Sequence, residues 1–227
     1  ETGQGLDIVL SGGEYGDAAA GPQRSRTEIW GSVDGTPYRL LEQSYAPSDC
    51  LYHAVLDANT AFLGGATDNF EQAETLYTKA ATDNSLVACG ARENEVTELQ
   101  SFSLYRLALI AAYRGQADVA TDLITSITST YPDSVYGNVG ASWLEAYTQG
   151  NAIDSACAAV TAYAAANPAA SEILADYGYA NPSFTGADIC PVIEEALPAP
   201  TEAAAASETT TEVPTEAITA TTATTAT

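Results

Sequence analysis

Four cysteines are the residues of this sequence whose type and spacing point most directly to chemistry: Cys50, Cys89, Cys157 and Cys190. Zinc sites and dithiol redox sites place cysteines in closely spaced pairs, with further cysteines or histidines nearby. This chain has no CxxC pair and a single histidine, so its even number of widely spaced cysteines predicts two disulfides. Among the three possible connectivities we predict the sequence-local one, Cys50–Cys89 and Cys157–Cys190; four buried free thiols are the alternative. Disulfides persist in oxidising compartments, so we expect a secreted, extracellular or cell-surface protein.

Catalytic side chains are sparse. His53 is the only imidazole, and it lies in the run CLYHAVL beside an apolar helical stripe, which favours a structural role over catalysis. Acidic pairs such as Glu93/Glu95 and Glu194/Glu195 are typical of a solvated face in a chain this acidic. A carboxylate pair like that of a glycosidase is the enzymatic alternative. The sequence has no nucleotide-binding loop and no EF-hand, so we predict a protein that is not an enzyme and binds no cofactor.

Charge excludes several classes of partner. The chain has 30 acidic and 7 basic residues, a formal net charge of −23 and a pI near 4.1. Nucleic acids and anionic membrane surfaces attract basic patches, which are absent, so we expect neither as a partner. No run approaches the ~20 apolar residues that a membrane-spanning helix needs, so no membrane insertion is expected. Self-association must overcome like charge through specific contacts, salt screening or bridging Ca²⁺.

Residues 1–45 are predicted to be a β or extended segment. In residues 6–11, LDIVLS, apolar and polar side chains alternate as in a strand, and glycines flank the run. Residues 27–43 contain an Asp34-Gly35 pair between two extended runs, which indicates a hairpin. Two or three strands alone are marginally stable in water, so this segment must pack on the next region or on a neighbouring chain. The candidate assembly strand comprises Leu6, Ile8, Val9 and Leu10.

Residues 46–197 read as an α-helical domain, because apolar residues recur at three- and four-residue spacing. Glycines and prolines mark the ends of the runs. Two short helices are expected to close the set. Tyr177 and Tyr179 follow no regular spacing and are expected to be exposed. The expected helices are 50–63, 69–82, 98–115, 117–132, 134–150, 152–168, 170–177 and 187–197.

An internal repeat with steps of 34 to 36 residues runs through this helical region. The repeated positions, expected to serve in packing and turns, are Tyr113, Gly115, Ala120 and Pro132, followed by Tyr147, Gly150, Ala156 and Pro168. On the segments 69–80, 111–134 and 144–168 the chain resembles the tetratricopeptide-repeat (TPR) family. The resemblance implies a mainly α fold of TPR-like stacked helical hairpins with a concave face, and partners bound as peptides or held in assemblies. An insertion of about ten residues after the first copy departs from the family pattern.

Residues 198–227 form a Thr/Ala/Pro-rich segment, expected to be an extended tail. It contains eleven threonines and nine alanines, with Val213 and Ile218 as its only larger apolar residues, so it cannot build a core. Such segments in extracellular proteins often carry O-linked sugar, so covalent O-glycans are predicted. The candidate sites are Thr209, Thr210, Thr211, Thr215, Thr219, Thr221, Thr222, Thr224 and Thr225.

Two functional hypotheses follow. In the first, the protein is a structural subunit of an extracellular filament or surface layer that assembles head to tail, as a homopolymer, through its terminal segments. In the second, it is a periplasmic or cell-surface TPR-like adaptor that binds a peptide or protein in its concave groove. Filaments would support the first hypothesis, whereas a monomer at every salt concentration would support the second.

Overall fold

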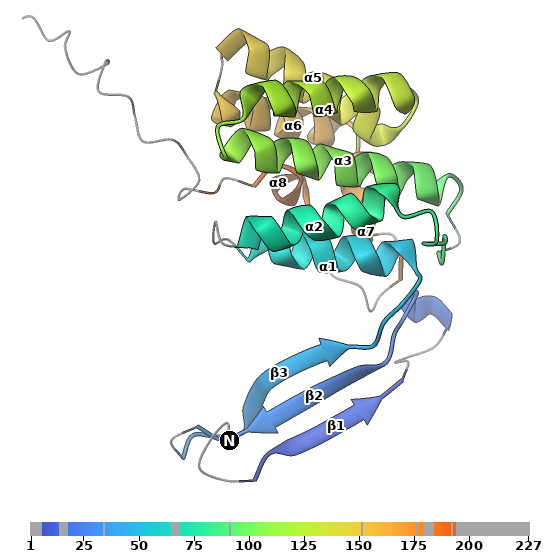
Figure 1. Ribbon diagram of the computed structural model, residues 1–227, viewed down its shortest axis with the longest axis vertical. Coiled ribbons are helices and arrows are strands. Elements are labelled where there is room, and N and C mark those ends of the chain that lie inside the picture. The colour runs from blue at the N-terminus through green and yellow to red at the C-terminus, as the bar shows by residue number, and fades with distance from the viewer. Residues whose placement is uncertain are drawn as a thin grey trace, which may run out of the picture. The chain divides into compact units, whose positions relative to one another are not determined.

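The computed structural model describes residues 6–13, 18–33, 35–64, 69–90, 92–150, 152–175, 177–178, 184–191 and 193. These residues build a mainly α-helical domain that follows a small antiparallel sheet, as the sequence predicts (Figure 1). The Thr-rich segment 198–227, with all nine candidate glycosylation threonines, lies outside the described residues, as does Tyr179.

The sheet has the strand order β1-β2-β3, with both pairs antiparallel. The pairing of β2 with β3 matches the hairpin expected over 27–43, although residues 32–38 make the connection longer than a two-residue turn. Gly35 in this connection has φ of 75°, a conformation that glycine adopts without strain. The strands are β1 Ile8–Gly12, β2 Arg26–Gly31 and β3 Arg39–Tyr45, and a short 3-10 turn, η1, spans Ala18–Ala20.

Three consecutive helical pairs, α1 with α2, α3 with α4 and α5 with α6, form the body of the domain. α2 also packs on α3, and α4 on α5, so the pairs stack in chain order (Figure 1). The helices are α1 Leu51–Leu63, α2 Asn69–Thr82, α3 Glu95–Tyr113, α4 Ala117–Thr130, α5 Val135–Gly150, α6 Ile153–Ala166, α7 Ala169–Ala175 and α8 Gly186–Ile189.

The repeat positions lie where close helix packing needs them. Ala120 and Ala156 are fully buried, so that their small side chains let neighbouring helices approach. Tyr113 and Tyr147 are also buried. Gly115 follows α3 with φ of 74° and opens the turn into α4. Gly150 is the last residue of α5, and Pro132 and Pro168 follow the ends of α4 and α6.

Two sequence-based expectations are wrong. The helix expected over 187–197 ends at Ile189 in the described residues, as the four-residue α8, because Pro191 disfavours the helical conformation at Cys190, which has φ of −138° and ψ of 73°. Tyr177 was expected to be exposed, but it is buried and stacks on Tyr52 with ring centroids 3.6 Å apart. The Tyr52 hydroxyl donates to the Leu174 carbonyl, so this stack ties α7 to α1.

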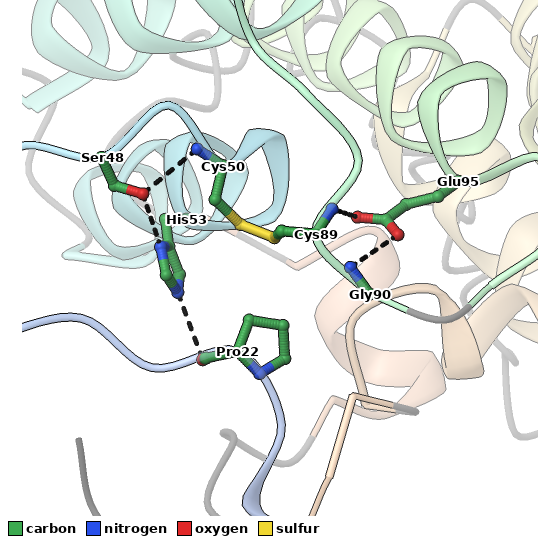
Figure 2. Close-up of a disulfide and its surroundings, with 7 residues drawn as sticks. All are labelled: Pro22, Ser48, Cys50, His53, Cys89, Gly90 and Glu95. Carbon is green, nitrogen blue, oxygen red and sulfur yellow. Dashed lines mark hydrogen bonds between the residues drawn. A yellow bond between two sulfur atoms is a disulfide. The ribbon is translucent and has the colours of Figure 1, made fainter. Parts of the chain in front are cut away.

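Both disulfides have the sequence-local connectivity. Cys50 pairs with Cys89 at a Cα–Cα distance of 5.5 Å, and Cys157 pairs with Cys190 at 5.2 Å. The first links the start of α1 to the loop before α3; Figure 2 shows it beside Glu95, whose carboxylate accepts the backbone N–H groups of Cys89 and Gly90. The two disulfides indicate an oxidising environment.

Candidate functional site

The predicted assembly strand lies at one edge of the sheet. β1 pairs only with β2, in a register that sets Ile8 opposite Trp30, Val9 opposite Ile29 and Leu10 opposite Glu28. The outer side of β1 has no partner strand among the described residues. An unpaired outer edge presents backbone N–H and C=O groups to any extended chain that approaches it.

The apolar side chains of β1 are unusually exposed. Val9 is 60% exposed and Leu10 is 52% exposed, and Leu6, just before the strand, is 83% exposed. Alternation along the strand places Ile8 and Leu10 on one face of the sheet and Val9 on the other. On the far strand, Leu40 and Tyr45 are exposed as well. The sheet therefore carries exposed apolar side chains on both faces, as interaction sites do.

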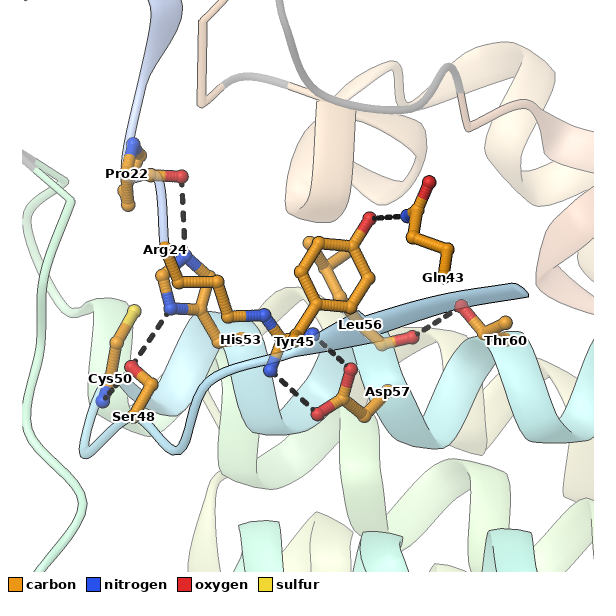
Figure 3. A network of polar contacts seen from close by, with 10 residues as sticks. All are labelled: Pro22, Arg24, Gln43, Tyr45, Ser48, Cys50, His53, Leu56, Asp57 and Thr60. Carbon is orange, nitrogen blue, oxygen red and sulfur yellow. Dashed lines mark hydrogen bonds and ion pairs between the residues drawn. The ribbon is translucent and has the colours of Figure 1, made fainter. Parts of the chain in front are cut away.

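A polar cluster at the base of the sheet joins it to α1 (Figure 3). The Arg24 guanidinium pairs with both oxygens of the Asp57 carboxylate and lies 4.2 Å from the centroid of the Tyr45 ring. Arg24 precedes β2, Tyr45 ends β3 and Asp57 belongs to α1, so one side chain links the sheet to the helical domain. Because Asp57 is 41% exposed at its side chain, solvent screening leaves this ion pair a modest contribution to stability.

Close backbone packing anchors the same segment a second time. The backbone of Ala20 and Gly21 lies against Gly178, where a Cβ atom would meet the Ala20 carbonyl carbon at 2.4 Å. Gly178 also has φ of 118°, so only glycine fits here without displacement of the chain. The segment before β2 is thus held against the helical domain, while β1 lies beyond it at the edge of the sheet.

His53, the only histidine, belongs to this cluster, and both of its ring nitrogens lie within hydrogen-bond distance of protein oxygens. Its Nε2 lies 3.2 Å from the Pro22 carbonyl oxygen and its Nδ1 lies 2.9 Å from Ser48 Oγ (Figures 2 and 3). A carbonyl oxygen only accepts, so Nε2 carries the proton and donates it, and Nδ1 accepts from the Ser48 hydroxyl. Ser48 Oγ in turn accepts the Cys50 backbone N–H at 3.1 Å. The neutral imidazole with its proton on Nε2 satisfies every bond of this chain.

Protonation of His53 gives the first testable prediction. Burial lowers the pKa of His53 below its ordinary value of 6.5, outweighing the hydrogen bond to Pro22, which raises it; Arg24 lowers it further and Asp57 raises it. The unfolded chain therefore takes up the proton first as the pH falls, and stability should decline below about pH 6.5 toward the folded-state pKa. We expect urea unfolding from pH 8 to pH 5 to show this decline, and the His53→Gln variant to lose it over the upper part of that range. Equal slopes in both proteins would contradict the assignment.

A buried arginine that sequence analysis missed, Arg106, holds the segment 184–191 against the helices. Arg106, on α3, is fully buried, and its guanidinium lies over the rings of Phe62, Phe102 and Phe184. It donates to Asn59 Oδ1 and to the backbone carbonyls of residues 188 and 189. Among the described residues it has no carboxylate partner. Arg106 thus fixes the segment 184–191 against α1 and α3.

A catalytic or metal centre does not emerge from the described residues. They contain no group of three or more His, Cys, Asp or Glu side chains placed to hold a metal ion. Glu95 is bound to backbone amides, and Glu194/Glu195 lie outside the described part of the chain. Calcium held between subunits remains an untested prediction. No described helix is both long enough and apolar enough to cross a membrane.

Comparisons with known protein families, with curated proteins and with solved structures find no match to this chain. The resemblance to the TPR family therefore remains a prediction, and what the structure contributes is a stack of helical hairpins and an exposed sheet.

Proposed function

We propose that this protein is a non-enzymatic, secreted structural subunit that assembles with copies of itself into an extracellular filament or surface layer, head to tail through its terminal segments. The single observation that carries the proposal is the three-stranded sheet whose edge strand β1 exposes Val9 and Leu10. Three strands gain independent stability from a buried apolar face, which this sheet lacks. Pairing of β1 with a strand of another copy would bond its outer backbone groups and bury part of its exposed side chains. Sugar on the threonines of residues 198–227 belongs to the same proposal.

Net charge opposes self-association, and salt has to screen it. Residues 46–197 hold 19 acidic and 4 basic residues, and residues 1–45 hold seven acidic and three basic, so both parts of the chain are acidic. Two copies therefore repel each other wherever they meet. β1, Ile8–Gly12, is itself uncharged, so contact through this strand places no charged side chain of the strand against another. Screening of the remaining repulsion requires salt, so assembly should strengthen as ionic strength rises.

Adding a charge to β1 tests the proposal. We expect Val9→Lys to weaken self-association at least tenfold, because a charged side chain on an edge strand opposes pairing with another strand. Val119→Lys is the matched control, since Val119 on α4 has a similar exposed fraction, 49%, and lies outside the sheet. Analytical ultracentrifugation and negative-stain electron microscopy between 0.05 and 1 M NaCl, about the range over which screening changes most, give the readout. Wild-type protein that stays monomeric throughout, or assembly that Val9→Lys leaves intact, would contradict the proposal.

A cell-surface or periplasmic adaptor is the alternative, and one observation favours it. A hollow of about 350 Å³ opens beside α1, lined mainly by apolar side chains that include Leu56, Leu63 and Phe184. Hollows of this size and lining accept small apolar groups, such as one side chain of a bound peptide. The same ultracentrifugation experiment separates the two functions, because an adaptor is a monomer at every salt concentration.

A further inference from the structure

The two open edges of the sheet differ in how well they are protected. β1, Ile8–Gly12, contains neither a charged residue nor a proline. β3 carries Arg39 and Glu42, and its pairing with β2 shifts register opposite Ile29/Trp30. Charges and register irregularities are the devices by which edge strands discourage further pairing. β1 is therefore the edge that accepts another strand, and β3 is the edge that resists one.

The β1 strand of a second copy makes a better pairing partner for β1 than β3 of that copy does, because its side chains are uncharged and mostly apolar. In an antiparallel pair centred on Val9, Val9 meets Val9 of the other copy, and Ile8 meets Leu10. Every one of these contacts joins apolar side chains on the same face, which stabilises neighbouring strands. Asp7 then lies opposite Ser11 rather than opposite Asp7, so the register avoids a like-charge contact.

A two-fold axis perpendicular to the sheet produces this arrangement, because it reverses the strand direction and keeps each face on its own side. An interface of this kind is self-complementary, so one exposed patch suffices for both partners. β1 itself contains no charged residue, so the strand that forms the contact brings no like charges directly together.

From this geometry we propose that β1 pairs antiparallel with β1 of a second copy across a two-fold axis at Val9, which joins two sheets into one of six strands. The inference rests on the proposed self-assembly and names the partner of its edge strand. The strand order across the pair is β3-β2-β1-β1-β2-β3. Growth of such pairs into a filament then uses a second contact elsewhere on each subunit, where the head-to-tail step of the proposed function takes place.

Single-cysteine variants test the symmetry directly. In the proposed pair the two Val9 Cα atoms lie about 4.5–5.5 Å apart, within the range that a disulfide bridges. Mild oxidation of Val9→Cys at assembling salt concentration is expected to give at least ten times more covalent dimer than Val119→Cys. A mixture of Ile8→Cys and Leu10→Cys should cross-link more than either variant alone. Peptide mapping without reduction verifies that the two native disulfides are intact.

The outcomes separate this inference from the proposed function. Assemblies that form without any self-linking of Val9→Cys would overturn the two-fold pairing and leave the structural subunit in place. If β1 instead paired with β3 of a neighbour, cross-links would appear only when cysteines on both strands are mixed. A protein that forms neither assemblies nor dimers would overturn both. Self-linking at Val9 together with the Ile8–Leu10 cross-link establishes the strand, its direction and its register.

Discussion

Replacing Arg106 with methionine is expected to lower the free energy of unfolding by about 2–4 kcal/mol. Methionine fills nearly the same space but donates no hydrogen bond. The carbonyl oxygens of residues 188 and 189, which accept from the guanidinium at 2.5 and 3.1 Å, would lose their donor. Asn59 Oδ1 would lose the guanidinium at 3.0 Å and keep the Tyr77 hydroxyl at 3.2 Å. Each buried polar group left without a partner costs roughly 1–3 kcal/mol, although water reaching part of the site reduces the sum.

A second effect acts in the opposite direction. Burying a charge is costly, and replacing buried ionic groups with apolar ones of similar volume is often neutral or stabilising when both partners change together. Arg106 has no carboxylate that changes with it, because its acceptors are one amide oxygen and two backbone carbonyls. The acceptors stay in place in the variant, so the loss outweighs the relief of desolvation. The attraction between the guanidinium and the nearby aromatic rings is lost as well.

Arg114→Met is the matched control, since Arg114 lies just past the end of the same helix. Its side chain is 31% exposed and pairs with the exposed Glu74, so removing it should cost less than about 1 kcal/mol. Urea denaturation of both variants measures the difference. Hydrogen exchange should locate the effect in residues 184–191, which Arg106 holds. Equal unfolding free energies for the two variants would show that the buried guanidinium contributes nothing beyond an exposed one.

The hydrogen-bond partners of Arg106 could not be predicted from the sequence. The run SLYRLALIAAY predicts a buried helix, and an arginine inside it calls for a partner. Residues three and four positions away are Phe102, Ser103, Leu109 and Ile110, none of which carries a charge. One partner, the Asn59 amide, lies 47 positions earlier in the chain. The other two lie 82 and 83 positions later, at backbone carbonyls that every residue possesses. A local pattern cannot identify such acceptors.

The helical domain was more predictable than its closing segments. The limits of α1, α2 and α5 follow from glycines and apolar periodicity that act within a few residues, and the structure places them within a residue of expectation. Tyr177 is buried instead of exposed because it packs on Tyr52, a contact between residues far apart in the sequence. For β1, the sequence predicted a strand, but its place at an open edge depends on the order in which the strands pair.

Removing the Cys157–Cys190 disulfide is expected to lower the free energy of unfolding by about 3–4 kcal/mol. The two cysteines are 33 residues apart, so the cross-link restricts a loop of that length in the unfolded chain. The double variant Cys157→Ala/Cys190→Ala measures the loss without adding free thiols. Its matched control is Cys50→Ala/Cys89→Ala, which opens a loop of similar length, 39 residues, elsewhere in the fold. Urea unfolding that changes by less than about 1 kcal/mol would contradict the prediction.

Combining each disulfide variant with Arg106→Met tests how the segment 184–191 is held. Cys190 and the acceptors of Arg106 belong to this one segment, and the Tyr113 hydroxyl donates to its Pro191 carbonyl. Loss of either anchor frees part of what the other holds. The combined variant should therefore lose at least about 1 kcal/mol less unfolding free energy than the sum of the two separate losses. The Cys50–Cys89 disulfide joins the start of α1 to the loop before α3 and includes no residue of this segment, so its effect should add to that of Arg106→Met within about 0.5 kcal/mol. An osmolyte such as trimethylamine N-oxide, at equal concentration for all variants, keeps the weakest one folded in the absence of urea. Strict additivity in both cycles would mean that Arg106 and the disulfide act on independent parts of the domain.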